Sequence, residues 1–577
     1  MAFLVAGTLQ VASQIADARE SLGRKGKYSM RGPRVALTLS SPEVSASVVA
    51  VLEGVFRTLG FESCQRREAS VQGFLGELAA FREQLDALGG PVGCALVALV
   101  APRGQLKQPQ QLVRELSRCG ALWGRPKVFL LLSSAPGAAP EPGAFLTGLS
   151  ELCGRFPHWS LLQLLTEVFC RTAEESEATY CPVLRSSLRG ALCLGDVEPW
   201  GPGPEPSPTA RYDLSGTRAA LLLSVIHGRP GAQHDVEALG ALCQALSFKT
   251  TLRTDPTAQA FQEELAQFRE CLDAHRAPVS CALVALMAHG GPQGQLLGAD
   301  GREVRPEALV QELSRCRALC GCPKIFLLQV CRGGEWGPNP HLPPPVLASH
   351  TQPSATQDLL STFFRKPERW CFTCPISGSL RASPRSQVHQ LEHFTLSSRC
   401  SLLWIFYSHG AALEFWGVGY GPLETPPRCL LSERACVSPP LPGHRDAGVG
   451  SAGLPWFRRW LRASPTTPSH ADVLQIYADV QGSSPFPTAG SSDQADILTV
   501  YAAAEGCVAY RDETGSDFIQ TLVEVFRADP GREVLELLTE VNRRVCQLEV
   551  LGPDCPERRK ACLEIRSSLR RRLCLQA

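Results

Sequence analysis

The sequence predicts an α/β protein whose parallel strands are buried on both faces. Two apolar runs carry this prediction, Cys281 to Ala288 (CALVALMA) and Lys324 to Val330 (KIFLLQV), and each has strand length and leads into a glycine-containing loop. A third observation is an internal repeat, in which Phe74 to Ala101 matches Phe261 to Ala288 at a constant offset. We therefore expect two α/β modules in tandem.

Each of the two apolar runs is followed by a residue able to do chemistry. His289 follows the first run and Cys331 follows the second. Because the carboxyl ends of parallel strands meet at one edge of a sheet, we expect these side chains to lie close together. An imidazole can convert a thiol into the thiolate that attacks carbonyl groups. The pair indicates Cys-His nucleophilic catalysis, and the alternative is an ordinary thiol beside a loop histidine.

Three motifs resemble the caspase family and fall in the order that the family has. Gln329 to Gly333 (QVCRG) follows the caspase cysteine signature, with His289 about 42 positions earlier. His289 to Gly301 (HGGPQGQLLGADG) resembles the histidine loop. Val500 to Leu522 (VYAAAEGCVAYRDETGSDFIQTL) resembles the start of the small subunit. The resemblance covers most of residues 211–336 and 496–577.

The resemblance implies a fold and an activity. Each module would be a three-layer domain with a mostly parallel six-stranded sheet and helices on both faces, and the second module would carry a long irregular insertion. The activity would be that of a cysteine endopeptidase that cleaves protein substrates after aspartate, in apoptosis or epidermal differentiation. The resemblance implies no cofactor. Two departures weaken it: Val330 replaces the alanine usual in the family, and the insertion is unusually long.

By the same resemblance, Cys331 would be the nucleophile and His289 the base that also protonates the leaving amine. The backbone N–H groups of Gly290 and Cys331 would stabilise the oxyanion.

The substrate carboxylate would be bound by Arg229, Gln329 and Arg511, with Tyr510 as an aromatic wall beside the substrate chain. Guanidinium groups bind carboxylates through two parallel hydrogen bonds. Without the resemblance, each arginine would be read as a solvated surface charge.

The first copy of the repeat has lost the corresponding residues. Pro102 stands at the position of His289, Leu132 at that of Gln329, and Ser134 at that of Cys331. We expect no counterpart of residues 500–517 in this copy and interpret it as a pseudoenzyme. An alternative function for the whole chain is a catalytically inactive regulator or decoy that binds other caspases.

The chain is expected to divide into six parts. These are a short leader (1–27), a degenerate caspase-like domain (28–199), a Pro/Gly linker (200–210), a large-subunit-like region (211–337), a low-complexity and largely disordered insertion (338–493) and a small-subunit-like region (494–577).

The insertion admits three readings: a disordered linker, a retained exon or misassembled gene model, and a small ordered domain. Within it, Val473 to Gly482 (VLQIYADVQG) resembles Ile497 to Gly506 (ILTVYAAAEG), and we take the second as the working strand. Cys371 and Cys374 form one CxxC pair without a second pair at zinc-finger spacing, so we expect no metal site.

Composition excludes several partners and locations. The 57 basic and 56 acidic residues nearly cancel, which argues against nucleic acid and anionic membranes as partners. The 24 cysteines show no regular framework, which favours a reducing, cytoplasmic location. Residues 402–419 contain His409 and Glu414 in a stretch barely long enough to span a bilayer, so we expect no membrane segment.

Both copies retain a match to the last strand of the caspase small subunit, through which caspases pair. The matching segments are Cys181 to Leu194 and Cys562 to Leu575. A tether between the copies raises their effective concentration. We therefore expect an intramolecular pseudo-dimer, or a dimer with another caspase.

Overall fold

The computed structural model describes the chain in twelve stretches. They are residues 26–90, 92–102, 105–106, 109–133, 142–175, 181–195, 210–291, 294–332, 471–478, 495–505, 509–548 and 561–576. Most of the insertion, with Cys371 and Cys374, lies outside them, as does Ser134.

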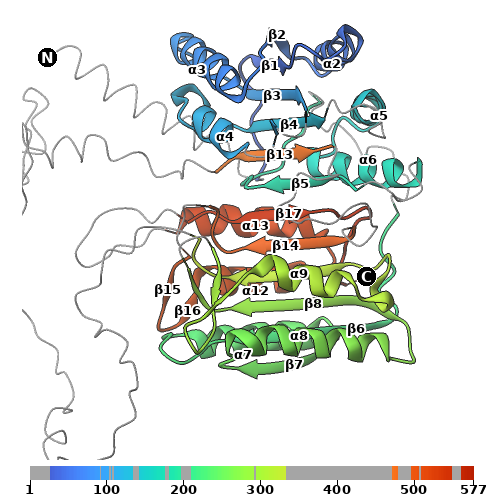
Figure 1. Cartoon of the computed structure of the whole chain (residues 1–577), viewed down its shortest axis with the longest axis vertical. Coiled ribbons are helices and arrows are strands. Elements are labelled where there is room, and N and C mark those ends of the chain that lie inside the picture. The colour runs from blue at the N-terminus through green and yellow to red at the C-terminus, as the bar shows by residue number, and fades with distance from the viewer. Residues whose placement is uncertain are drawn as a thin grey trace, which may run out of the picture. The chain divides into compact units, whose positions relative to one another are not determined.

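A single mixed sheet of twelve strands organises the described residues (Figure 1). Six strands form what we call the N-terminal half: β1 (Arg34–Ser40), β2 (Glu62–Arg67), β3 (Cys94–Ala101), β4 (Lys127–Ser133), β5 (Val183–Ser186) and β13 (Val473–Tyr477). The other six form the C-terminal half: β6 (Thr217–Ser224), β7 (Phe248–Thr254), β8 (Val279–Met287), β12 (Lys324–Gln329), β14 (Ile497–Tyr501) and β17 (Glu564–Ser567).

The two halves have the same strand order when each is followed inward from its outer edge. The order is β2-β1-β3-β4-β13-β5 in one and β7-β6-β8-β12-β14-β17 in the other. All neighbours within a half are parallel except the last pair, where β5 runs antiparallel to β13 and β17 antiparallel to β14. The α/β class and the mostly parallel sheet are as predicted.

The position of β13 differs from the sequence expectation. Residues 338–493 were treated as one irregular insertion, and the first copy was expected to lack a counterpart of the small-subunit strand. Instead Val473–Tyr477 is a buried strand that lies between β4 and β5, an orange arrow among the blue and cyan strands of Figure 1. β13 links β4 to β5, which do not pair with each other in the described sheet. Its apolar residues are part of the core on both faces of the N-terminal half.

A repeated side-chain cluster anchors β13 and β14 in equivalent positions. Before β13, the buried Asp472 accepts a hydrogen bond from Tyr28 Oη at 2.5 Å and a bidentate pair from Arg189 at 2.8 and 2.6 Å. Before β14, Asp496 has the equivalent partners, Tyr212 and Arg570. Both aspartates have a φ of 63°, a left-handed conformation.

Helices cover both faces of the sheet. The N-terminal half has α2 (Ala46–Thr58), α3 (Val71–Ala87), α4 (Gln110–Ser117), α5 (Pro142–Arg155) and α6 (Leu161–Glu175), and the C-terminal half has α7 (Ala232–Ala245), α8 (Ala258–Asp273), α9 (Pro306–Ser314), α12 (Asp517–Ala528) and α13 (Val534–Gln547). On one face, a continuous core joins α2, α5 and α6 to α7, α12 and α13. On the other face, α3 and α4 cover one core and α8 and α9 cover another.

The two halves meet where β5 pairs antiparallel with β17. Hydrogen bonds from helices extend this junction: Gln163 Nε2 donates to Glu536 Oε1 at 2.6 Å, and the fully buried Asn542 donates to the carbonyls of Ser187 and Leu188. The junction therefore combines backbone pairing, side-chain hydrogen bonds and a shared hydrophobic core.

Candidate active site

The strand register brings the histidine loop and the cysteine together. In the parallel pair of β8 and β12, Met287 lies opposite Gln329, so His289 and Cys331 each come two residues after matched positions. A Cβ added to Gly290 would lie 2.0 Å from the carbonyl oxygen of Cys331. Only glycine permits this approach of the two loops.

The Cys331 thiol is partly exposed at this edge of the sheet. Its Sγ lies 3.5 Å from the carbonyl oxygen of Ala509, in the segment that follows β14. The thiol is thus accessible to a substrate and is flanked by the segment that carries Tyr510 and Arg511.

His289 belongs to a small three-stranded sheet made of β9 (His289–Gly290), β10 (Leu296–Leu297) and β11 (Glu303–Val304). Its side chain is exposed at the edge of the sheet. Partial desolvation and then the positive charge of Arg229 lower the pKa of the imidazole, against a hydrogen bond to the Gly228 backbone that raises it. The ring is therefore oriented by a backbone group and neutral at pH 7, the state that a general base needs.

Of the three side chains that were predicted to bind a carboxylate, Arg229 and Gln329 are buried and Arg511 is partly buried. Arg229 is 6% exposed, and its Nη1 donates to the carbonyls of Val225 at 2.5 Å and Met287 at 3.0 Å. Within the described part of the chain, Gln329 Oε1 and Arg511 Nη1 are buried without a hydrogen-bond partner. Such unsatisfied polar atoms are costly unless a ligand pairs with them.

The region around these three side chains is positively charged. Burial, followed by the proximity of Arg511, lowers the pKa of Arg229 to about 9, which still leaves it charged at pH 7. Burial also lowers the pKa of Arg511, while Asp235 opposes the shift. The two arginines therefore place positive charge near the Cys331 thiol, where an anion would be favoured.

Tyr510 is partly buried and packs, with Ala509, against the main hydrophobic core. It directly precedes β15 (Arg511–Asp512), which forms a hairpin with β16 (Gly515–Ser516). Tyr510 therefore lies at the entrance of the hairpin, and Arg511 is held within it by pairing with Ser516.

Arg332, directly after the cysteine, connects the site to the junction of the halves. Its Nη1 lies 2.8 Å from Glu564 Oε2 on β17, and its guanidinium stacks over Tyr501 with 4.2 Å to the ring centroid. Burial opposes ionisation of Glu564, but the arginines Arg332 and Arg566 outweigh it and hold the pKa of this carboxyl well below its usual range.

Sequence reasoning missed Asp235, which is fully buried and lies 3.1 Å from Arg511 Nη2. The signal was an aspartate in the first turn of a helix that begins shortly after Arg229. This pattern is too common to single out a residue whose partners lie far away in sequence.

The N-terminal half lacks these groups. Leu132 pairs in register with Val100, as Gln329 does with Met287, and Leu132 is buried in the core. Pro102 stands where His289 would be, so neither the imidazole nor the amide of the C-terminal half has a counterpart at these two described positions.

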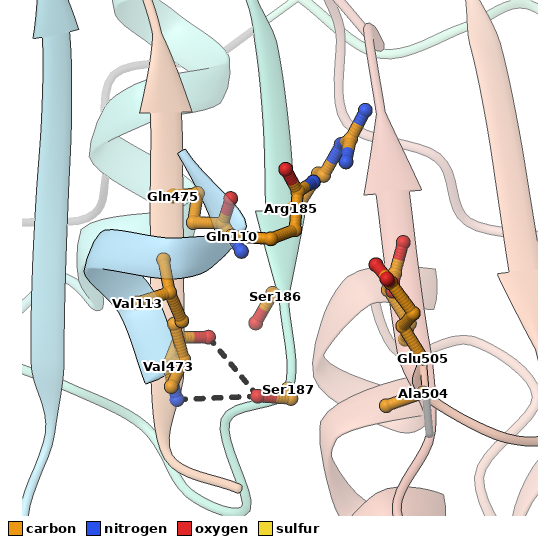
Figure 2. A pocket seen from close by; sticks show the side chains of 10 residues that line it. Gln110, Val113, Arg185, Ser186, Ser187, Val473, Gln475, Ala504 and Glu505 are labelled. Atoms are coloured by element: carbon orange, nitrogen blue, oxygen red, sulfur yellow. Dashed lines mark hydrogen bonds between the residues drawn. The ribbon is translucent and has the colours of Figure 1, made fainter. Parts of the chain in front are cut away.

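A separate pocket lies at the junction, with about 470 Å³ of solvent-open space (Figure 2). Its lining comes from both halves and includes Arg185, Gln475 and Glu564. Figure 2 also shows Ser187 bonded through Oγ to the backbone of Val473. None of the predicted site residues lines it, and no catalytic role follows from it.

Among the described residues, no three or more His, Cys, Asp or Glu side chains gather in a way that could hold a metal ion. The helices of this part of the chain are each too short or too polar to cross a bilayer.

Comparison with known proteins identifies the family. Residues 217–574 match the family model described as Caspase domain, so the chain belongs to the caspase family, as predicted. Caspase-14 of Homo sapiens is 29% identical over 370 residues, which cover 63% of this chain and 96% of that protein. Caspase-14 of Mus musculus is 45% identical over 141 residues, covering 24% of this chain and 54% of that protein.

The motifs YDLSGTRAALLL and EIRSSLRRRLCLQ also resemble the caspase-14 type. Among solved structures, caspase-1 from Spodoptera frugiperda is 17% identical, with a TM-score of 0.33, and the match covers 65% of this chain and 98% of that chain.

Proposed function

We propose that the C-terminal half is an aspartate-directed cysteine endopeptidase. The observation that carries the proposal is the strand register that brings the residues after β8 and β12, His289 and Cys331, to one edge of the sheet, together with the unpaired Nη1 of Arg511. A thiol and a positively charged neighbour suit a substrate that presents a carbonyl group and a nearby carboxylate.

In the proposed reaction, Cys331 Sγ attacks the backbone carbonyl carbon of the substrate aspartate while its proton passes to His289. The backbone N–H groups of Gly290 and Cys331 stabilise the negative oxygen of the tetrahedral intermediate. The C–N bond then breaks as His289 returns the proton to the leaving amine. Water, deprotonated by His289, hydrolyses the thioester and restores the thiol.

We further propose that the N-terminal half is the pairing partner of this enzyme within one chain. The alternative, a decoy that binds other caspases, requires a free pairing strand. Here β17 is paired with β5, so that edge is occupied. Every cysteine that the structure describes is unpaired, which supports the cytoplasm as the location. A role in apoptosis or epidermal differentiation remains part of the proposal.

The proposal predicts that an aspartyl fluoromethylketone probe labels Cys331 and that the protein cleaves peptides after aspartate. Cys331→Ala should abolish labelling and cleavage, because it removes the nucleophile. His289→Ala should lower cleavage at least a hundredfold, about the contribution of a general base. Mass spectrometry of the labelled protein and a fluorogenic peptide assay provide the measurements.

Cys320→Ala is the matched control, since Cys320 is an exposed thiol at the opposite end of β12. It should change neither labelling nor cleavage. Intact cleavage by Cys331→Ala would disprove the assignment of the nucleophile, and an inert wild-type protein would favour a non-catalytic regulator.

A further inference from the structure

Asp235 connects α7 to the hairpin that carries Arg511. Its Oδ1 accepts hydrogen bonds from the Ser516 N–H at 2.7 Å and from Gln520 Nε2 at 3.3 Å. Its Oδ2 lies 3.1 Å from Arg511 Nη2. One fully buried carboxylate therefore contacts both the backbone of the hairpin and the guanidinium of Arg511.

Two glycines make this contact sterically possible. A Cβ on Gly231 would lie 2.1 Å from the carbonyl oxygen of Asp512, and a Cβ on Gly515 would lie 2.7 Å from Asp235 Oδ1. Both glycines have positive φ, 73° and 127°. The loop before α7 and the β15–β16 hairpin thus pack at a distance that side chains would prevent.

The contact determines which nitrogen of Arg511 remains available. With Nη2 at Asp235, Nη1 is left buried and without a partner among the residues that the structure describes. The charges of Arg229, Arg511 and Asp235 sum to one positive charge, which matches one substrate carboxylate. A guanidinium fixed at one nitrogen presents the other in a defined direction, so less freedom is lost when the ligand binds.

We propose that Asp235 is a positioning residue for substrate specificity: it fixes Arg511 so that the free Nη1 meets the aspartate side chain of the substrate. This inference rests on the proposed function and names a residue that acts through Arg511 rather than on the substrate. The neighbouring Glu237 differs from Asp235, because it is exposed and accepts a hydrogen bond from Gln233 on the same helix.

The test measures peptide binding, so that it does not depend on turnover. The full chain carrying Cys331→Ala is titrated into fluorescein-labelled peptides that end in aspartate or asparagine, and fluorescence anisotropy gives the Kd. Four proteins are compared with the control on this background. They carry no further change, Asp235→Asn, Arg511→Ala, or both of these substitutions together. Asparagine can still accept the hydrogen bond from the Ser516 N–H, and Glu237→Gln on the same helix is the matched control.

Asp235→Asn should weaken binding of the aspartate peptide about tenfold, leave the asparagine peptide unchanged and have no further effect when Arg511 is already alanine. Glu237→Gln should change nothing. Equal weakening of both peptides, or an effect that persists without Arg511, would show a general structural role and overturn the inference. Equal affinity of the Cys331→Ala protein without further change for both peptides would overturn it too, because the protein would then not distinguish a carboxylate from an amide. Preferential binding without cleavage by the protein with Cys331 intact would refute only the proposed catalysis.

Discussion

At His289, burial and neighbouring charge act in the same direction. Partial desolvation disfavours the charged imidazolium, and the nearby cations Arg229 and Arg511 disfavour it further. The residues that would recognise a negative substrate thus also favour the neutral form of His289. In the proposed mechanism, this coupling links specificity to the protonation state of the general base.

The coupling predicts the pH dependence of cleavage. A base must be unprotonated, so activity is lost as pH falls through its pKa, which lies below the ordinary value of 6.5. The acid limb of kcat/KM, which reports the free enzyme, should therefore lie below pH 6.5 in the wild type and move to higher pH in Arg229→Gln, because a positive charge is removed. Measurements at peptide concentrations well below KM between pH 4.5 and about 8 test this.

Arg253→Gln is the control, since Arg253 is exposed on β7 and is paired with Glu264. It should leave the acid limb in place. A limb above pH 6.5 in the wild type, or one that Arg229→Gln does not move, would remove His289 from the role of base.

Sequence motifs could name Cys331, His289 and Arg511 because their local patterns are distinctive. They could not identify Asp235, whose partner Ser516 is 281 positions away. Its contact with Arg511 depends on the docking of α7 against the hairpin, which no local pattern encodes. A residue with a distinctive local motif is thus easier to predict than one whose role depends on contacts distant in sequence.

Among the elements, α13 begins at an unusual residue. Glu533 is 4% exposed at its N-cap and accepts a hydrogen bond from the Glu536 N–H. Burial raises its pKa to about 7, although backbone hydrogen bonds oppose the shift. The equivalent helix α6 is preceded by the neutral Ser160, which bonds to Gln163.

A raised carboxyl pKa makes the folded state less stable as pH increases. The stabilising contribution of protonated Glu533 is complete below its unfolded pKa of 4.5 and is lost as pH rises through about 7. Glu533→Gln should therefore increase the free energy of unfolding at pH 8, by at most about 3 kcal/mol, and have little effect at pH 4.5. Urea unfolding at both pH values measures the difference.

Exposed Glu263→Gln on α8 provides a comparison and should be neutral at both pH values. If Glu533→Gln destabilised the protein equally at pH 4.5 and 8, the buried carboxyl would act only through its hydrogen bonds.

The apolar runs predicted β8 and β12 because strands buried on both faces need apolar residues throughout. The same reasoning recognised the likeness of β13 to β14 but could not assign β13 to the first copy. Which half a strand joins depends on its neighbours in space, and the place of β13 between β4 and β5 is visible only in the folded sheet.

At the scale of the whole molecule, the pairing of β5 with β17 predicts the oligomeric state. Because the two halves satisfy each other's pairing edges, the full chain should have the mass of one chain in solution. A shortened chain that begins at Arg211 would expose β17 and should self-associate. Light scattering over a range of concentrations tests both.

Light scattering over this range of concentrations also shows which part of the prediction fails. A full chain that dimerises would show that the junction of the halves leaves another pairing surface. A shortened chain that stays monomeric would show that β17 does not drive association.

The location of β13 has a consequence for proteolytic processing. A cut anywhere between residues 333 and 470 divides the backbone, yet the C-terminal piece then supplies β13 to one half and β14 and β17 to the other. Each half would then be built from the same two polypeptides, because the N-terminal piece also supplies strands to both halves. Release of the N-terminal half would require a further cut between β5 and β6, and β13 would have to be cut from β14 or withdrawn from between β4 and β5. A single cut in the insertion therefore frees neither half.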